Sequence, residues 1–286
     1  MKKTILKILA WVVCIMALFS FVHASAENND KSLSLLAINV RKADCLLLRC
    51  GSSAYLIDTG LKDTVEQVLS VLAAEGVTHL DGIILTHTHS DHAGGLKKLL
   101  ASDLEIDALY ASRFYVEIKE GKHPIEKALN KNPQREGIRI GWLSAGDTLP
   151  LDGGSLDVLG PVEESEKENC NSVVLLASGG GGTMLLAGDM EIPEETSLLA
   201  AGLIPKVDVL KIGNHGEQDA TGPALIRACE PKVALISTNT EDEKDTPHKR
   251  VIGLLNQWNV SIYQTQHTVD GVLVTIRNGE ISVEQK

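Results

Sequence analysis

Aromatic side chains are scarce in this chain of 286 residues, since phenylalanine, tryptophan and tyrosine together make up 3% of it. Basic residues are few as well, and 27 lysines and arginines against 38 acidic residues give a formal net charge of -11. Proteins that coat nucleic acids use basic surfaces and stacking rings, so the composition does not favour that class. The hydrophobic fraction of 43% excludes an intrinsically disordered chain and allows a sizeable core.

Two common catalytic signatures are also missing. The four glycines at 179–182 are not followed by a Lys-Ser or Lys-Thr pair, which excludes the phosphate-binding loop of nucleotide hydrolases. No Gly-x-Ser-x-Gly sequence occurs, which excludes the nucleophile elbow of serine hydrolases. Because the four glycines lie between two strand-like runs, they predict a hairpin turn.

A single long apolar run occurs, at residues 8–22, and it follows three lysines. It ends at Ala24-Ser25-Ala26, a small-x-small cleavage pattern. We therefore predict a signal peptide at residues 1–26, cleaved near Ala26, with a retained membrane anchor as the alternative. Loss of the three lysines deepens the net charge from -11 to −14. The remaining chain, 27–286, is expected to be secreted or extracytoplasmic, with no stable membrane span.

Four cysteines follow the predicted cleavage site: Cys45, Cys50, Cys170 and Cys229. Export permits disulfides. Cys45 and Cys50, however, are five apart in one strand-like run, so their side chains point to opposite faces and do not favour a bridge. Buried thiols are the prediction for most of the four.

Short apolar runs alternate with helical segments along residues 27–286, and this mixture predicts one α/β domain. Strands are expected at 34–40, 45–49, 54–57, 82–85, 172–177, 183–187, 207–212, 233–237, 261–265 and 272–276. Helices are expected at 65–74, 194–201, 223–228 and 248–258, with a further helix start at 94–100. The charged, irregular segment 112–136 is interpreted as a surface helix or lid.

The segment Thr86–Gly95 concentrates side chains that bind metals. Three imidazoles and one carboxylate occur within six positions, at His87, His89, Asp91 and His92. His87 and His89 are two apart in extended backbone, so their side chains point the same way. This mixture of nitrogen and oxygen ligands suits borderline cations, so the segment predicts a metal site. The two glycines that close it allow the backbone to pass close to a neighbouring strand end.

This segment resembles the His-x-His-x-Asp-His motif, followed by Gly-Gly, of the metallo-β-lactamase-fold hydrolases. Three further segments resemble motifs of that superfamily in the same order: Leu56–Gly60, Leu186–Met190 and Leu210–Gly216. They contribute Asp58, Asp189 and His215. The resemblance covers nearly all of the exported chain and implies an α/β fold, the αββα four-layer sandwich of two mixed sheets flanked by helices.

Within the superfamily, the chain is most similar to the hydrolase domain of ComEC-type DNA-uptake proteins and their stand-alone relatives. Asn39–Asp44 resembles the family's Val-Gly-Gln-Gly-Asp segment, although Arg41-Lys42 depart from its glycine-rich middle. Asn171–Leu175 is similar to the family's Asn-x-x-Ser-Val-Val-Leu passage, and Tyr263–Gly271 to its C-terminal stretch. The resemblance implies a competence-related hydrolase.

One feature of the superfamily is missing. Many members supply a histidine in a third motif ahead of Asp189, and His123 is the only histidine between residues 93 and 188. His123 lies in an irregular loop and is interpreted as a solvated surface residue. Asn171, a water molecule or the thiolate of Cys170 is then expected to complete the first metal site.

The resemblance implies a centre for one or two Zn²⁺ ions, with Mn²⁺ as the alternative metal. The ligands of one ion would be His87, His89 and Asp189, and those of the other Asp91, His92, His215 and the shared Asp189. Asp58 is expected to orient a ligand imidazole, and Asp91 to accept a proton during catalysis. His248, at the start of a predicted helix, either protonates the leaving group or caps that helix.

The resulting hypothesis is an exported metal-dependent hydrolase that uses a metal-bound hydroxide, with a phosphodiester as the favoured substrate. Amide, ester or β-lactam hydrolysis is the alternative among enzymes. A non-catalytic binding protein on a degenerate hydrolase fold is the alternative of another class, because the third-motif histidine is missing. The expected partner is a small molecule or a phosphodiester; a nucleic acid stays open, although the charge does not support it. The sequence carries no signal for an oligomeric state.

Overall fold

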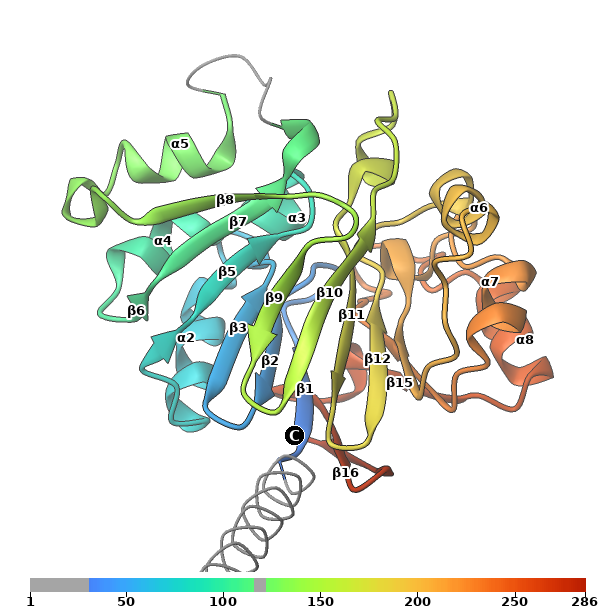
Figure 1. Ribbon diagram of the computed structural model, residues 1–286. Helices are drawn as coiled ribbons and strands as arrows, with labels where there is room; N and C mark the ends of the chain where they lie inside the picture. Colours follow the sequence, from blue (N-terminus) through green and yellow to red (C-terminus); the bar gives the residue numbers. More distant parts are fainter. Residues whose placement is uncertain (1–30, 116–121) are drawn as a thin grey trace, which may run out of the picture.

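Two mixed β-sheets stacked face to face form the centre of the molecule (Figure 1). The structure is a computed structural model that describes residues 31–115 and 122–286. In this part of the chain the first sheet has the order β17-β16-β1-β2-β3-β5-β7-β8. Its strands are β1 (Leu33–Ile38), β2 (Leu46–Cys50), β3 (Ser53–Ile57), β5 (Gly82–Leu85), β7 (Ala108–Ser112), β8 (Arg139–Leu143), β16 (Gly271–Arg277) and β17 (Glu280–Gln285).

The second sheet has the order β15-β14-β13-β12-β11-β10-β9 among the described residues. Its strands are β9 (Thr148–Leu151), β10 (Gly154–Gly160), β11 (Val174–Gly179), β12 (Gly182–Leu186), β13 (Val209–Lys211), β14 (Val233–Ile236) and β15 (Ser261–Gln264). The strands from β9 to β12 pair antiparallel, whereas those from β12 to β15 run parallel. Two short strands, β4 (His79–Leu80) and β6 (Glu105–Ile106), pair separately.

Helices cover the outer face of each sheet (Figure 1). The first sheet carries α2 (Val65–Ala74), α4 (Leu96–Ala101) and α5 (Pro124–Leu129), and the second carries α6 (Ile192–Ala200), α7 (Pro223–Cys229) and α8 (Lys249–Gln257). One apolar cluster fills the space between the sheets, and one lies under each layer of helices. This arrangement confirms the predicted αββα four-layer sandwich.

The alternation of side chains along β1 shows how the strands serve two cores at once. Leu33 and Leu35 lie in the cluster between the sheets, whereas Leu36 and Ile38 lie in the cluster under α2 and α4. Successive side chains of a strand point to opposite faces, so a strand buried on both faces needs apolar residues at nearly every position. The continuous apolar runs in the sequence have this cause.

The cysteines follow the same rule. Cys45, Cys50, Cys170 and Cys229 are all buried and free in the described chain. Cys50 lies in the cluster between the sheets and Cys45 in the cluster under the helices, so the two thiols point to opposite faces. The predictions of buried thiols and of no bridge between Cys45 and Cys50 are confirmed.

The predicted hairpin at residues 179–182 is confirmed. Gly179 and Gly182 pair across β11 and β12, and the loop residues Gly180 and Gly181 have φ angles of +59° and +81°. A two-residue turn with positive φ at both central positions suits the twist of the flanking strands, and glycine adopts it without strain.

The predicted helix at 65–74 and the predicted strand at 82–85 have the observed bounds. The sequence pattern does not predict β7 to β10 or β17. The strands β8 and β17 are edges of the first sheet and expose most of their residues, which weakens the apolar signal. The segment 112–136 contains α5, whose Ile125 and Ala128 pack into the cluster of the first sheet.

The predicted signal peptide and its cleavage site lie outside the described residues. In the described parts of the chain, no helix combines the length and the apolar character that crossing a membrane requires.

The turn after the histidine-rich segment requires a glycine at position 95. A Cβ atom there would lie 2.8 Å from Cγ2 of Val65 and closer still to the backbone oxygen of Thr59. We expect Gly95→Ala to lower the free energy of unfolding by about 1–3 kcal/mol, because overpacking against backbone is not relieved by a rotamer change. Urea denaturation measures the effect.

The matched control for this variant is Gly253→Ala. Gly253 lies inside α8, and its Cβ would meet nothing within 4 Å. Alanine is the better helix former, so this variant should gain about 0.5–1 kcal/mol of stability. Equal effects of the two substitutions would contradict the packing argument.

Candidate metal centre

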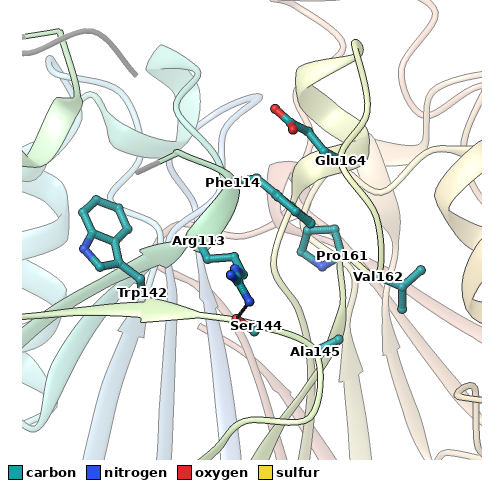
Figure 2. Close-up of a pocket in the computed structure, with 8 residues that line it drawn as sticks. All are labelled: Arg113, Phe114, Trp142, Ser144, Ala145, Pro161, Val162 and Glu164. Atoms are coloured by element: carbon teal, nitrogen blue, oxygen red, sulfur yellow. Dashed lines mark hydrogen bonds between the residues drawn. The ribbon is translucent and has the colours of Figure 1, made fainter. Parts of the chain in front are cut away.

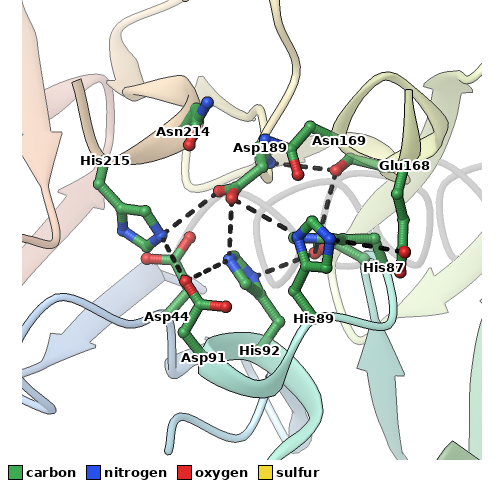
Figure 3. Close-up of polar contacts among 12 residues, drawn as sticks. Asp44, His87, His89, Asp91, His92, Glu168, Asn169, Asp189, Asn214 and His215 are labelled. Atoms are coloured by element: carbon green, nitrogen blue, oxygen red, sulfur yellow. Dashed lines mark hydrogen bonds and ion pairs between the residues drawn. The ribbon is translucent and has the colours of Figure 1, made fainter. Parts of the chain in front are cut away.

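The predicted ligands lie at one edge of the sandwich, where strands of both sheets end (Figure 3). The histidine-rich segment follows β5, Asp189 follows β12 and His215 follows β13. β5 runs parallel to β3, and β13 runs parallel to β12, so neighbouring carboxyl ends share one edge in each sheet. The Val173 N–H donates to the Thr86 carbonyl oxygen at 2.9 Å and ties the two edges together.

Four of the predicted ligands form the centre of the cluster: Asp91, His92, Asp189 and His215. Each offers one ligand atom, and these atoms all lie within 4.8 Å of one another. Nε2 of His92 is 3.2 Å from Oδ2 of Asp189, and Nε2 of His215 is 3.3 Å from Oδ2 of Asp91. The other oxygen of Asp189 is 3.6 Å from Nε2 of His215, so Asp189 lies within reach of both imidazoles.

The other two predicted ligands extend the cluster on one side. Nε2 of His87 is 3.7 Å from Oδ2 of Asp189, and the His87 side chain is fully buried. Nδ1 of His89 is 3.0 Å from Nε2 of His87. The His89 side chain is 46% exposed, so it lies on the solvent side. The structure therefore brings all six predicted ligands to one place.

Hydrogen bonds orient two of the rings. Oδ2 of Asp58 is 2.7 Å from Nδ1 of His92, and Asp58 also accepts a hydrogen bond from the Thr86 N–H at 2.8 Å. Nδ1 of His215 donates to the Ser237 carbonyl oxygen at 2.9 Å. With Nδ1 engaged in both rings, each Nε2 points into the cluster, as metal-binding histidines do when a polar group orients them.

The backbone at the site adopts uncommon conformations. Asp58, Asn214 and His215 have φ angles of +60°, +43° and +52°. Residues with a Cβ seldom occupy this left-handed region, although aspartate, asparagine and histidine tolerate it better than most. The turn at Asn214 and His215 directs the imidazole of His215 back over the ends of the strands.

The charges of the cluster are tightly coupled. Burial alone lowers the pKa of His92 and raises that of Asp189, but the attraction between imidazolium and carboxylate outweighs it. The pKa of His92 therefore lies well above its usual value and that of Asp189 well below. Burial and the neighbouring His92 hold the pKa of His87 well below its usual value. A neutral His87 beside an ionised Asp189 is the form in which both side chains bind metals.

Missing hydrogen-bond partners in the cluster also indicate a metal site. In the described chain, three buried ligand atoms have no hydrogen-bond partner: His92 Nε2, Asp189 Oδ1 and His215 Nε2. Buried polar atoms without partners are rare in folded proteins, and a bound ion can satisfy such atoms. The residues present therefore fit a divalent cation.

Asn171 and Cys170, two of the three candidates for the missing third-motif ligand, make other contacts in the structure. Oδ1 of Asn171 accepts a hydrogen bond from the Ser165 N–H and its Nδ2 donates to the Ser165 carbonyl, both at 2.8 Å. This amide therefore holds its own loop. Burial raises the pKa of Cys170, whose Sγ lies 4.0 Å from the Glu191 carboxylate, so a thiolate is disfavoured. The water molecule is the remaining alternative of the three.

Other residues of η3 (Glu168–Asn171) approach the cluster instead. Oε1 of Glu168 accepts a hydrogen bond from the Thr88 N–H at 3.1 Å, and its Oε2 is 3.5 Å from Nε2 of His89. Oδ1 of Asn169 is buried without a hydrogen-bond partner, and Figure 3 shows this side chain pointing toward the cluster. No motif in the sequence points to Glu168 or Asn169, because η3 reaches the site only through the fold.

A buried ion pair adjoins the cluster. Nζ of Lys211 is 2.8 Å from Oδ2 of Asp44 and 3.0 Å from the Ile212 carbonyl oxygen, and neither charged side chain is more than 1% exposed. Burial raises the pKa of Asp44, but the charge of Lys211 outweighs it and the net shift is downward. The signal for this pair in the sequence is a lysine inside the apolar run 207–212.

His248 lies at the start of α8 and caps it. Its Nδ1 accepts a hydrogen bond from the Arg250 N–H at 3.3 Å. In the described chain no hydrogen bond or ion pair joins its ring to the predicted ligands. Of the two predicted roles of His248, the structure shows the helix cap. Protonation of a leaving group stays a prediction.

The prediction that His123 is a solvated surface residue is wrong. The side chain is 2% exposed, and its Nδ1 accepts a hydrogen bond from the Ile125 N–H at the start of α5. Its ring meets that of Trp142 edge to face, with the ring centroids 5.3 Å apart. The packing of α5 onto the sheet buries a ring that the local sequence places in a loop.

Comparison with known proteins agrees with this geometry. The model of the metallo-beta-lactamase superfamily matches residues 38–240. The ComE operon protein 3 of Bacillus subtilis (strain 168) is 31% identical over 199 residues, 69% of this chain and 25% of that protein. The competence protein ComA of Neisseria gonorrhoeae is 25% identical over 260 residues, 89% of this chain and 34% of that protein. The chain thus spans about a quarter to a third of these relatives.

Two further matches are informative. Recombination protein 2 of Haemophilus influenzae is 28% identical over 200 residues, 70% of this chain and 23% of that protein. The crystal structure of a diphosphatase of the PhnP family superposes with a TM-score of 0.51 at 12% identity, covering 86% of this chain and 97% of that one, and shows the shared fold. The chain therefore belongs to the metallo-β-lactamase superfamily of hydrolases, and its similarity to ComEC-type hydrolase domains is confirmed.

Proposed function

We propose that this chain hydrolyses phosphodiester bonds with one or two divalent metal ions held by the cluster around Asp189. The observation that carries the proposal is the buried set of imidazoles and carboxylates in which three ligand atoms lack hydrogen-bond partners. This donor set suits Zn²⁺, with Mn²⁺ as the alternative. Relatives named for competence and recombination, and a fold neighbour described as a diphosphatase, support a phosphate ester as the substrate.

Two adjoining sets of side chains would hold the ions. One set is His87, His89 and Asp189, and the other is Asp91, His92, His215 and the shared Asp189. When bound, such ions supply Lewis acidity and lower the pKa of a bound water molecule. The neutral form of His87, favoured by burial and by His92, is ready to bind without releasing a proton.

Asp91 would act as the proton acceptor. Burial raises its pKa, but the neighbouring imidazoles of His215 and His92 outweigh burial and bring the pKa to about 2. The carboxylate is therefore ionised at neutral pH, and its side chain is 28% exposed and so open to solvent. Asp58 and the Ser237 carbonyl would keep the rings of His92 and His215 in place during the reaction. His248 would protonate a leaving group from Nε2, since its Nδ1 accepts the hydrogen bond that caps α8.

We also propose that the protein acts outside the cytoplasm after cleavage near Ala26. The support is the order of lysines, apolar run and small residues in the first 26 positions. Mass spectrometry of the protein recovered from the medium or the periplasm tests this directly. A mature N-terminus at Glu27 is expected, and an intact Met1 in a membrane fraction would favour the anchor.

The activity is tested on four substrates: bis-p-nitrophenyl phosphate, single-stranded DNA, double-stranded DNA and a chromogenic cephalosporin. We expect hydrolysis of the phosphodiesters that depends on Zn²⁺ or Mn²⁺. His87→Ala should lower kcat/KM by about 100-fold or more. Loss of a residue that merely orients a metal ligand lowers activity by about 10–100-fold, and this substitution removes a ligand itself. His79→Ala is the matched control, since that imidazole is 43% exposed and pairs with Asp107.

Each other outcome selects an alternative. Hydrolysis of the cephalosporin alone would overturn the phosphodiester proposal in favour of β-lactam or amide chemistry. A protein that binds less than one equivalent of metal and cleaves none of the four substrates would be the non-catalytic binding protein.

A further inference from the structure

A cavity of about 730 Å³ opens where β7 and β8 end (Figure 2). Arg113, Phe114 and Trp142 line it on one side, and Pro161 and Glu164 line it on the other. The first three belong to the first sheet and the turn after β7, whereas the last two follow β10 of the second sheet. The cavity therefore lies between the edges of the two sheets, as the candidate metal centre does.

Strand register places the cavity close to the metal centre. β5, β7 and β8 are parallel neighbours, with Leu85 opposite Ala111 and Ser112 opposite Leu143. The turn at Arg113 therefore lies one strand away from the histidine-rich turn after β5, and the end of β8 lies two strands away. Neighbouring strands are about 5 Å apart, so the cavity begins within roughly 5–10 Å of the histidines.

A hydrogen bond and an ion pair, both made by Glu168, connect the turn beside the cavity to the metal centre. Oη of Tyr115, in the turn after β7, donates to the Glu168 carbonyl oxygen at 3.2 Å. The carboxylate of the same Glu168 is 3.5 Å from Nε2 of His89. Glu168 therefore links the turn after β7, which supplies part of the cavity wall, to the metal centre.

The aromatic rings of this wall are unusual for the protein. The chain is poor in aromatic residues, yet Phe114 and Trp142 both line this cavity. The Trp142 residue is 38% exposed, and its ring is held from one side by the edge-to-face contact with the buried His123. A fixed, partly exposed indole offers a flat surface for stacking at little cost in conformational entropy.

The wall also carries a cation without a charged partner. Nη1 of Arg113 donates a long hydrogen bond of 3.4 Å to Oγ of Ser144, and no ion pair of Arg113 is found in the described chain. Glu164 lies on the opposite side of the cavity (Figure 2). Guanidinium groups bind phosphates through paired N–H donors, so the Arg113 side of the cavity favours a phosphate.

We propose that this cavity is a subsite beside the metal centre that binds a nucleobase of the substrate together with the adjoining phosphate. The inference rests on the proposed function, because it assigns the part of the substrate that flanks the cleaved phosphodiester. Trp142 stacks on the base, and Arg113 contacts the phosphate. Such a site needs neither a basic surface nor many rings, so it is compatible with the net charge and the scarcity of aromatics.

The test measures binding and not cleavage. Fluorescence anisotropy compares a labelled ten-nucleotide oligothymidylate with an abasic oligonucleotide of the same length, in EDTA so that neither is hydrolysed. We expect the oligothymidylate to bind at least about fivefold more tightly, which is the lower limit for stacking of one base. Trp142→Ala should remove this preference. Arg113→Ala should lower the affinity for both oligonucleotides by the same factor.

Trp258→Ala is the matched control, because Trp258 is 37% exposed and lies outside the cavity. A second measurement uses the quenching of tryptophan emission, which does not depend on truncating the indole. The oligothymidylate should quench emission in Trp258→Phe, which keeps Trp142, and not in Trp142→Phe.

Equal affinity for the two oligonucleotides, no binding of either, or an effect of Trp258→Ala equal to that of Trp142→Ala would overturn the inference. The outcome is independent of the hydrolysis assays. Specific binding without any hydrolysis would remove the proposed enzyme activity and leave the cavity as a binding site. Hydrolysis of bis-p-nitrophenyl phosphate without base-dependent binding would support the proposed enzyme activity and overturn the role of the cavity.

Discussion

Lys211→Met is expected to lower the free energy of unfolding by about 3–5 kcal/mol. The substitution leaves the Asp44 carboxylate buried and unpaired, and removing one partner of a buried ion pair has an effect of this size. The methionine fills most of the space of the lysine stem, so the loss reports charge and not a cavity. Urea denaturation at pH 7 measures the difference.

A double substitution separates the effect of charge from that of packing. Asp44→Leu combined with Lys211→Met removes both charges, and we expect it to recover much of the stability that the single variant loses. Lys232→Ala is the control for an exposed pair, because Lys232 is 66% exposed and pairs with Asp208 at 2.7 Å. It should change stability by less than about 1 kcal/mol. A double variant as unstable as the single one would show that the loss comes from packing and not from charge.

The sign of the pH dependence follows from the same pair. In the wild type, Lys211 holds the pKa of Asp44 below its usual value, so the stabilisation is present above that usual value and is lost as the pH falls. In Lys211→Met the largest opposing charge is gone, so burial raises the pKa of Asp44 against only the weaker effects of His215 and His92. The folded variant then takes up a proton more readily than the unfolded chain, so its deficit should shrink as the pH falls from 8 toward 5.

Asp189→Asn is expected to abolish metal binding at both positions of the centre. Asp189 lies between the imidazoles of His87, His92 and His215, and the amide removes the charge that attracts a cation to all of them. Loss of a supporting residue lowers metal affinity by about 10–100-fold, so loss of a shared ligand should lower it by about 100-fold or more.

The measurement is the stabilisation of the protein by added Zn²⁺. A ligand that binds the folded state at 100 times its Kd stabilises by about 2.7 kcal/mol, so the wild type should show a large rise in Tm and Asp189→Asn none. Asp63→Asn is the control, since Asp63 is 71% exposed and pairs with Arg41. An equal rise in Tm for wild type and Asp189→Asn would show that Zn²⁺ binds elsewhere.

The chemistry of the site could be predicted from local sequence because four of its six predicted ligands are close together in the chain. His87, His89, Asp91 and His92 follow one strand within six positions. Backbone geometry over so short a distance fixes the direction of the side chains, whatever the rest of the fold does. The hairpin at 179–182 is local in the same sense.

The place of the missing third-motif ligand could not be predicted in this way. Asn171 and Cys170 occur at the expected point of the sequence, but a short helical turn directs Asn171 to the backbone of Ser165 and Cys170 toward Glu191. The side chains that approach the cluster from this turn are those of Glu168 and Asn169. Successive side chains of a 3-10 turn point about 120° apart, so neighbours in one turn face different surroundings.

The sequence by itself determined the class of fold, the alternation of strands and helices and the metal-binding chemistry of Thr86–Gly95, because these depend on residues within one or two elements. Only the tertiary structure decided which distant groups join them. Lys211 and Asp44 pair across 167 positions of the chain, and Trp142 meets a histidine that the sequence assigned to the surface. Such contacts are set by how the two sheets and their helices pack, and no periodicity in the sequence encodes that packing.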